Sequence, residues 1–160
     1  MAASTQPLST NLSWMLSHAS YTLTTELTAA LEQLGISPRA HCVLSAAATG
    51  EHTQTELAQM IGLDKTTLLV TLDELEAAGL AERRPSEKDR RVRVIAVTEA
   101  GRRTLAEAEN IADRVQADVL GALSPAERKV FVDALGRLVS DRLARPVVCA
   151  HPVRRRSPRG

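Results

Sequence analysis

Residues 53–80 of the chain read TQTELAQMIGLDKTTLLVTLDELEAAGL. Thr53 and Glu56 have the spacing of a capping box, in which each side chain satisfies a backbone N–H of the other residue, so a helix is expected to begin here. A glycine follows two turns later, and Asp64 then has the position of an N-cap for a second helix that ends before Gly79. Two short helices joined by a glycine-containing turn predict a helix-turn-helix.

Each of these two helices is expected to bury one face. The apolar residues at helical spacing are Leu57, Met60 and Ile61 in the first helix and Leu68, Leu72 and Leu75 in the second. About half a turn away, the second helix has an outer face formed by Lys65, Thr66, Leu69, Val70 and Asp73. The side chains in the middle of this outer face are short and uncharged, unlike those on the solvent-exposed face of an ordinary helix.

The segment after the second helix is predicted to form a hairpin. Its strands are LAERR at 80–84 and VRVIAV at 92–97, and the polar tip PSEKDR between them starts with the turn former Pro85. The hairpin contains six basic residues, which are Arg83, Arg84, Lys88, Arg90, Arg91 and Arg93. Helix, turn, helix and basic hairpin together predict a mainly α (α+β) winged helix-turn-helix.

With these residues in place, the centre of the chain resembles the multiple-antibiotic-resistance-regulator (MarR) family. The matching residues are Leu57-Ala58, Gly62-Leu63, Thr67, Leu75-Glu76, Gly79-Leu80, Arg83, Asp89-Arg90-Arg91 and Thr98-Glu99-Ala100-Gly101. The resemblance implies a homodimeric transcriptional regulator that binds a roughly palindromic operator in double-stranded DNA, as a repressor relieved by a small-molecule ligand. Two alternatives remain open: a metal- or redox-sensing regulator of the same family, and a winged-helix module for protein–protein interaction.

The flanking helices carry more apolar surface than one winged domain can cover. Apolar residues keep helical spacing from Leu8 to Leu34 and from Leu105 to Leu138, and the resemblance implies that such terminal helices pack between two subunits. The predicted organisation is a flexible N-terminus at 1–7, a MarR-like domain at 8–144 and a disordered basic tail at 145–160. Within the domain, the winged helix-turn-helix is expected at about 37–98 and long N- and C-terminal dimerisation helices at about 8–35 and 99–144.

The bulk composition excludes several function classes. Aromatic residues make up 2% of the chain, which argues against a single-strand binder, because such proteins stack bases on aromatic side chains. The only cysteines, Cys42 and Cys149, cannot form a disulfide scaffold and indicate a reduced compartment. No apolar run is long enough to cross a bilayer, so a cytoplasmic protein without membrane contact is expected. The net charge of +1 decides nothing by itself.

The candidate DNA-contacting residues lie on three segments. On the second helix they are Lys65, Thr66 and Thr67, which suit phosphates or base edges, and Leu69 and Val70, which suit thymine methyl groups. The family often has arginine at the position of Val70, and Leu69 has the competing interpretation of a broader core face. At the start of the first helix they are Thr53, Gln54 and Thr55, whose N–H groups suit a phosphate, with capping alone as the alternative.

In the hairpin the candidates are Arg83, Arg84, Lys88, Asp89, Arg90, Arg91 and Arg93. The resemblance implies that Arg91 enters the minor groove, whose negative potential attracts a guanidinium. Asp89 is expected to brace Arg91 through a bidentate pair. Arg93 departs from the family, which usually has an apolar residue there, and is expected to turn outward. The competing interpretation of the whole set is a solvated charged turn.

The resemblance implies a small-molecule site, for which the candidates are Trp14, His18 and Tyr21 at helical spacing, with Arg39 and His41 on the next helix. An aromatic or phenolic anion would fit them, although packing alone also explains each residue. Cys42 is expected to be a buried structural thiol. The histidines have no zinc-ligand spacing, and no nucleotide-binding or hydrolase motif is present, so no metal, cofactor or catalysis is expected.

Overall fold

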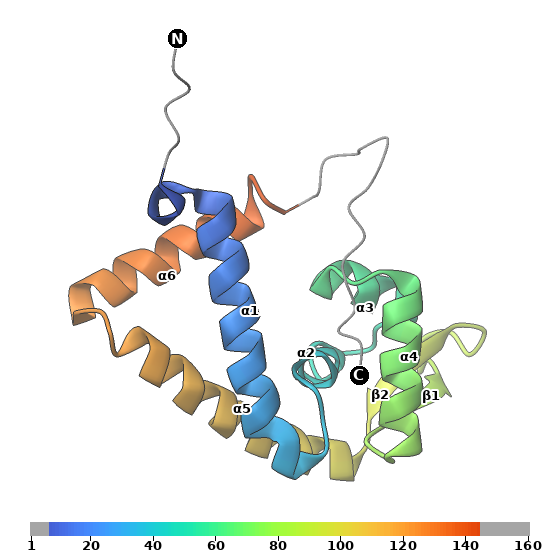
Figure 1. The fold of residues 1–160 in the computed structure, drawn as a ribbon. Helices are drawn as coiled ribbons and strands as arrows, with labels where there is room; N and C mark the ends of the chain where they lie inside the picture. The colour runs from blue at the N-terminus through green and yellow to red at the C-terminus, as the bar shows by residue number, and fades with distance from the viewer. Residues whose placement is uncertain (1–6, 145–160) are drawn as a thin grey trace. The chain divides into compact units, whose positions relative to one another are not determined.

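The computed structural model describes residues 7–144, and its elements are mostly helices. They are the 3₁₀ helix η1 (Leu8–Thr10), α1 (Leu12–Leu31), the 3₁₀ helix η2 (Glu32–Leu34), α2 (Pro38–Ala47), α3 (Gln54–Ile61), α4 (Lys65–Ala77), β1 (Ala81–Pro85), β2 (Arg93–Val97), α5 (Glu99–Leu120) and α6 (Pro125–Ser140). The predicted mainly α fold with one small antiparallel sheet is confirmed (Figure 1). The chain divides into two compact units, with the boundary inside α5 after Ala117. The predicted basic tail at 145–160 lies outside the described residues, as do residues 1–6 of the predicted flexible N-terminus.

The helix-turn-helix forms from the capping residues that the sequence indicated. Thr53 and Glu56 make the capping box of α3, with the Thr53 N–H donating to the Glu56 carboxylate at 2.7 Å. Gly62 ends α3 in the left-handed region at φ 65°, a conformation that costs glycine little. The Asp64 carboxylate then accepts from the Thr67 N–H at 2.9 Å and starts α4. These local bonds set the turn between the two helices.

The core of the first unit lies between α2, α3 and α4. Leu68, Leu72 and Leu75 of α4 are buried as predicted. On α3, Leu57 is buried, but the prediction for Met60 is wrong, because this side chain is 52% exposed. The neighbouring Ala58 takes the second buried position of α3 instead. A small residue there allows α3 to approach α2 and α4 closely.

The hairpin confirms the predicted wing. Strands β1 and β2 pair antiparallel from Ala81 opposite Val97 to Pro85 opposite Arg93. Pro85 therefore ends β1 as a paired residue, and the tip consists of residues 86–92. A further bridge joins the loop before α3 to the sheet, since the Ile95 N–H donates to the His52 carbonyl at 2.9 Å. The wing is thus tied to the helix-turn-helix along one edge.

The start of α5 packs tightly against the turn between α4 and β1. The Thr98 hydroxyl donates to the Gly79 carbonyl at 2.7 Å and accepts from the Gly101 N–H at 3.0 Å. The Thr98 N–H donates to the Leu80 carbonyl at 3.1 Å. A Cβ atom added at Gly101 would lie 1.9 Å from that carbonyl oxygen. The glycine therefore permits a close approach of helix and turn that a side chain would block.

The prediction of one continuous helix from Leu8 to Leu34 is wrong in detail. Asn11 has an extended backbone with ψ 104° and accepts from the Trp14 N–H at 2.9 Å, so it ends η1 and caps α1. Asparagine favours such a local cap over a helix interior. The expected stop at Gly35 is confirmed, because this residue lies in the left-handed region at φ 65°.

In the single chain, the terminal helices α1 and α6 expose large apolar side chains to solvent. In α1 only Leu31 is buried, and in α6 no residue is buried. The exposed large apolar residues of these two helices are Leu12, Trp14, Met15, Tyr21, Leu23, Val130, Phe131, Val132, Leu138 and Val139. Among residues 7–144, no helix is both long and apolar enough to cross a membrane.

Candidate nucleic-acid interface

The outer face of α4 is open to solvent as predicted. Lys65 and Thr66 are exposed, and the two apolar side chains that follow are 42% exposed at Leu69 and 53% exposed at Val70. The interpretation of Leu69 as a broader core face is therefore wrong. Its carbon atoms are available to a partner, as are those of Val70.

Not every polar residue of α4 is free to contact a partner. The Thr67 hydroxyl donates to the Asp64 carboxylate at 2.6 Å, alongside the backbone bond that caps the helix. The hydrogen bonds from Thr67 lower the pKa of Asp64, so the cap is charged at neutral pH. Thr67 is therefore engaged in capping, which leaves Lys65 and Thr66 as the polar groups at the start of the outer face.

The six basic residues of the wing fall into two groups. Arg83 and Arg84, on β1, are held by carboxylates. Arg83 lies between Glu76 and Asp73 of α4, at 2.8 Å from Asp73, and its backbone N–H also donates to Glu76. These bonds fix β1 to α4 and neutralise the Arg83 guanidinium.

The second group lies at the tip and at the start of β2. It consists of Lys88, Arg90, Arg91 and Arg93, which are all exposed. None of these four side chains has an ion-pair partner within residues 7–144. Unpaired exposed cations on one projection attract a polyanion more strongly than neutralised ones do. Arg93 is exposed, as the sequence predicted.

The tip is held by a carboxylate that sequence reasoning missed. The Ser86 hydroxyl donates to Glu51 at 2.7 Å and the Glu87 N–H donates to it at 3.0 Å. Bonds from Glu87 and then Ser86, followed by the charge of Arg84 at 3.8 Å, lower the pKa of Glu51. Ser86 is itself buried and accepts from the Lys88 N–H at 3.1 Å. Glu51 therefore anchors the tip to the loop between α2 and α3.

Asp89 contributes to the tip in a different way from the one expected. Its carboxylate accepts from the Arg91 backbone N–H at 3.0 Å, and the ion pairs within residues 7–144 include none between the two side chains. The predicted bidentate brace is thus replaced by a backbone turn. This arrangement shapes the tip and leaves the Arg91 guanidinium without an ionic partner in the described chain.

The start of α3 is occupied by its own cap. The hydrogen bonds from the Thr53 N–H at 2.7 Å and the Thr53 hydroxyl at 2.8 Å to the Glu56 carboxylate lower the pKa of Glu56. Gln54 and Thr55 follow with partly buried and exposed side chains, respectively. Capping accounts for Thr53, and a phosphate contact by Gln54 and Thr55 stays a prediction.

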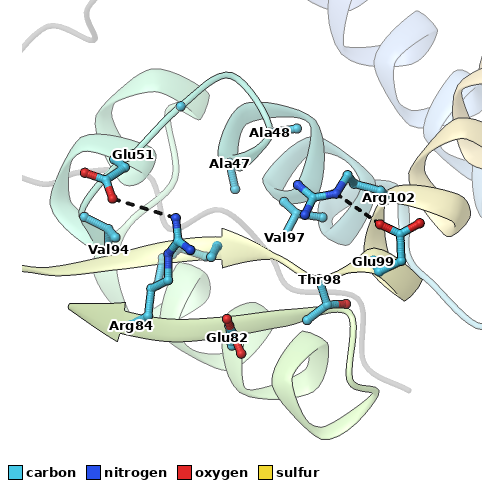
Figure 2. Close-up of a pocket in the computed structure, with 13 residues that line it drawn as sticks. Ala47, Ala48, Glu51, Glu82, Arg84, Val94, Val97, Thr98, Glu99 and Arg102 are labelled. Carbon is cyan, nitrogen blue, oxygen red and sulfur yellow. Dashed lines mark ion pairs between the residues drawn. The ribbon is translucent and has the colours of Figure 1, made fainter. Parts of the chain in front are cut away.

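A cavity of about 470 Å³ lies on the sheet face beside the anchor (Figure 2). Arg84 and Arg102 line it together with Glu51, Glu82 and Glu99. Arg102 lies 3.7 Å from Glu99, so both guanidinium groups of the cavity have carboxylate neighbours. With three carboxylates to two guanidinium groups, this cavity has no excess positive charge to attract phosphate. The basic side chains without an ion-pair partner among residues 7–144 lie at the wing tip and at the start of β2 instead.

The residues expected to bind a small molecule are only partly brought together. The rings of Trp14 and His18 stack at 5.0 Å with 5° between their planes, while Tyr21 is 74% exposed. On α2, which contacts α1, Arg39 is exposed. The Nε2 atom of His41 is inaccessible and has no hydrogen-bond partner in the described chain. A role of these residues in ligand binding stays a prediction.

The prediction that Cys42 is a buried thiol is wrong, because its side chain is exposed in the single chain. Desolvation by partial burial still raises the pKa of this thiol. A raised pKa keeps the sulfur protonated at neutral pH, and the thiolate is the reactive form. Residues 7–144 contain no group of three or more His, Cys, Asp or Glu side chains placed to hold a metal ion.

Comparison with known proteins gives the same family throughout. The MarR family model matches residues 34–92. A MarR-family transcriptional regulator from Rhodococcus sp. RHA1 is 26% identical with a TM-score of 0.76, covering 86% of this chain and 99% of that one. CouR from Rhodococcus jostii RHA1, solved with p-coumaroyl-CoA, is 27% identical with a TM-score of 0.77, covering 91% and 99%.

The repressor CouR has also been solved on a 23-mer DNA duplex, at 26% identity and a TM-score of 0.76 over 91% of this chain and 100% of that one. The match spans the helix-turn-helix and the wing, and it extends over the terminal helices. The predicted resemblance to the MarR family of transcriptional regulators is therefore confirmed, by the family model over residues 34–92 and by these similar structures.

Proposed function

We propose that the protein is a homodimeric transcriptional repressor that binds a specific site in double-stranded DNA and is released from it by a small molecule. The observation that carries this proposal is the pairing of an open α4 face with a wing that has four cations, at its tip and at the start of β2, without an ion-pair partner among residues 7–144. A helix of this width fits the major groove, and the tip arginines suit the minor groove beside it. A regulator of this kind has no catalytic task.

The dimer is supported by the apolar side chains of α1 and α6. Phe131 and Val130 are 49% and 68% exposed in the single chain, and a second copy is the partner that buries them symmetrically. A two-fold axis then presents two wings and two α4 helices to the two halves of a roughly palindromic operator. The related CouR, a repressor solved on a DNA duplex, supports this arrangement.

Relief by a ligand is supported by the stacked pair of Trp14 and His18 and by the related CouR, which was solved with an aromatic acyl-CoA. A small aromatic or phenolic anion near this pair is expected to quench Trp14 fluorescence and to weaken DNA binding. The coupling is reciprocal, so bound operator DNA must lower the affinity for the ligand by the same factor by which the ligand lowers the affinity for DNA. If a ligand quenches Trp14 fluorescence without changing the affinity for DNA, release by that ligand is not part of the mechanism.

The test of DNA binding starts from a pool of randomised duplexes, from which the full chain should enrich one sequence. Binding to the enriched duplex is then measured by fluorescence anisotropy at several salt concentrations. Replacing Arg91 by alanine is expected to cost about 1–3 kcal/mol per half-site and to lower the salt slope by about one unit per lost phosphate contact.

The matched control is Arg103→Ala on α5, because Arg103 is exposed but pairs with Glu99 at 3.5 Å. It should leave both affinity and salt slope unchanged. The proposal fails if no duplex is enriched. It also fails if the two variants weaken binding equally, because the wing would then contribute only general charge.

A further inference from the structure

The outer face of α4 lacks the side chains that read purines by paired hydrogen bonds. Guanine is read mainly by arginine or lysine and adenine by asparagine or glutamine, each through two bonds to one base edge. The α4 sequence KTTLLVTLDELEA contains no arginine, asparagine or glutamine. Its one lysine, Lys65, is the first residue of the helix, beside the turn rather than in the middle of the face.

The remaining polar groups of this face are also accounted for. The Thr67 hydroxyl donates to Asp64, and Asp73 lies 2.8 Å from the Arg83 guanidinium. These two interactions mark the N-terminal and C-terminal limits of the face. Between Asp64 and Asp73, the exposed side chains are Lys65, Thr66, Leu69 and Val70. The middle of the face therefore presents methyl groups and one hydroxyl.

The surrounding charge identifies the partner of this apolar strip. The wing follows α4 in the chain and is tied to it through Arg83. Its tip and the start of β2 contribute four cations that have no ion-pair partner among residues 7–144. A strip of apolar side chains that lies beside exposed cations fits a partner with an anionic backbone and a groove that contains apolar groups. In duplex DNA that group is the C5 methyl of thymine, which projects into the major groove.

We propose that Leu69 and Val70 set operator specificity by contacting thymine methyl groups, so that the bases under α4 are recognised as A·T pairs by apolar contact. This inference rests on the proposed function and adds the chemistry of the readout. Thr66 can add a methyl contact or a single hydrogen bond at the edge of the same strip. The expected operator has thymines at fixed positions in each half-site, and their methyl groups carry a measurable part of the affinity.

The experiment replaces one thymine at a time by deoxyuridine in the duplex that the full chain enriches. This change removes the methyl group and keeps every hydrogen-bonding atom of the base. Burial of one methyl-sized group corresponds to about a four-fold change in affinity. One or two positions in each half-site should therefore lose about four-fold when deoxyuridine replaces thymine, and the other thymines should lose nothing.

The same duplexes are then measured with Leu69→Ala and Val70→Ala. Each variant should bind the thymine duplex more weakly than the wild type does. At the thymine that the truncated side chain contacts, replacement by deoxyuridine should then no longer lower the affinity. Met60→Ala is the matched control, because it also truncates an exposed apolar side chain, on α3. It should keep the full four-fold penalty, whatever it does to overall affinity.

The outcomes separate the inference from the proposed function. If a duplex is enriched but deoxyuridine is tolerated at every position, methyl recognition is wrong and DNA binding stands. If the penalty persists unchanged in both α4 variants, the methyl groups are read by other side chains and the assignment to Leu69 and Val70 is wrong. If no duplex is enriched, the proposed function fails and this inference fails with it.

Discussion

Replacing either of two helical glycines by alanine should have opposite effects on the stability of the protein. Gly101 lies in the first turn of α5 and Gly136 lies in α6. Alanine is favoured over glycine in a helix by about 1 kcal/mol, so intrinsic propensity predicts that both substitutions stabilise. At Gly101, however, the surrounding residues make the substitution by alanine destabilising.

At Gly101 the new Cβ would lie 1.9 Å from the Leu80 carbonyl oxygen and 2.8 Å from the Val97 side chain. The oxygen belongs to backbone, so α5 and the turn before β1 must move apart by roughly 1 Å, and overpacking of this kind costs about 1–3 kcal/mol. The shift also weakens the 3.1 Å bond from the Thr98 N–H to the same oxygen, worth about 1 kcal/mol. After the gain in helix propensity, Gly101→Ala should destabilise by about 1–3 kcal/mol.

The Cβ added at Gly136 meets no atom within 4 Å among residues 7–144. Gly136→Ala should therefore stabilise by about 0.5–1 kcal/mol. Both variants are compared with the wild type by urea unfolding, followed by far-ultraviolet circular dichroism at one protein concentration, because a dimer gains stability with concentration. If Gly101→Ala is as stable as the wild type, the close approach of α5 to the turn does not exist in solution, and the reasoning from the Leu80 carbonyl is refuted.

Three further changes test other parts of the structure. Glu51→Gln should release the wing tip, so that trypsin cleaves after Lys88 faster while the helix content is unchanged; unchanged cleavage would mean that the anchor is not needed. Because hydrogen bonds lower the pKa of Glu51 in the folded protein from its ordinary 4.5, the same release should occur only as the pH falls below that value and through the folded pKa. The wild type should sediment at about twice 17.3 kDa, and Phe131→Arg should shift it towards the single-chain mass; a wild-type monomer at micromolar concentration would contradict the proposed dimer. Arg83→Ala should lower the midpoint of unfolding, since it leaves the two α4 carboxylates unpaired, whereas an effect on salt slope alone would assign Arg83 to DNA instead.

The helix-turn-helix could be predicted from the sequence because its determinants are local. The capping box of Thr53 and Glu56 spans one turn of helix, and so does the cap formed by Asp64 and Thr67. Glycine at position 62 marks the turn by its conformational freedom. Each signal acts within three or four residues, so it is readable before the chain is folded, and the periodicity of the α4 leucines then gives the buried face.

The features that could not be predicted depend on residues far apart in the chain. Glu51 and Ser86 are separated by 35 positions, and nothing in the residues around Glu51 indicates that it will meet the wing. Met60 has the same helical spacing as its buried neighbours, and only the packing of α3 against α2 and α4 leaves it exposed. The break at Asn11 was missed for a different reason, since its cap is local but lies within a continuous apolar pattern that favours an uninterrupted helix.

The wing shows why a count of basic residues is a weak guide to a DNA-binding surface. All six cations lie on one hairpin, yet pairing divides them by position. Arg83 and Arg84 on β1 meet carboxylates of α4, of the loop before α3 and of the tip, so their charge is used to fix the wing. The tip cations keep their charge for a partner because the tip is shaped by uncharged donors, namely the Ser86 hydroxyl and backbone N–H groups that meet Glu51 and Asp89. These bonds hold the tip in place, and its guanidinium groups keep the charge that the proposed minor-groove contact requires.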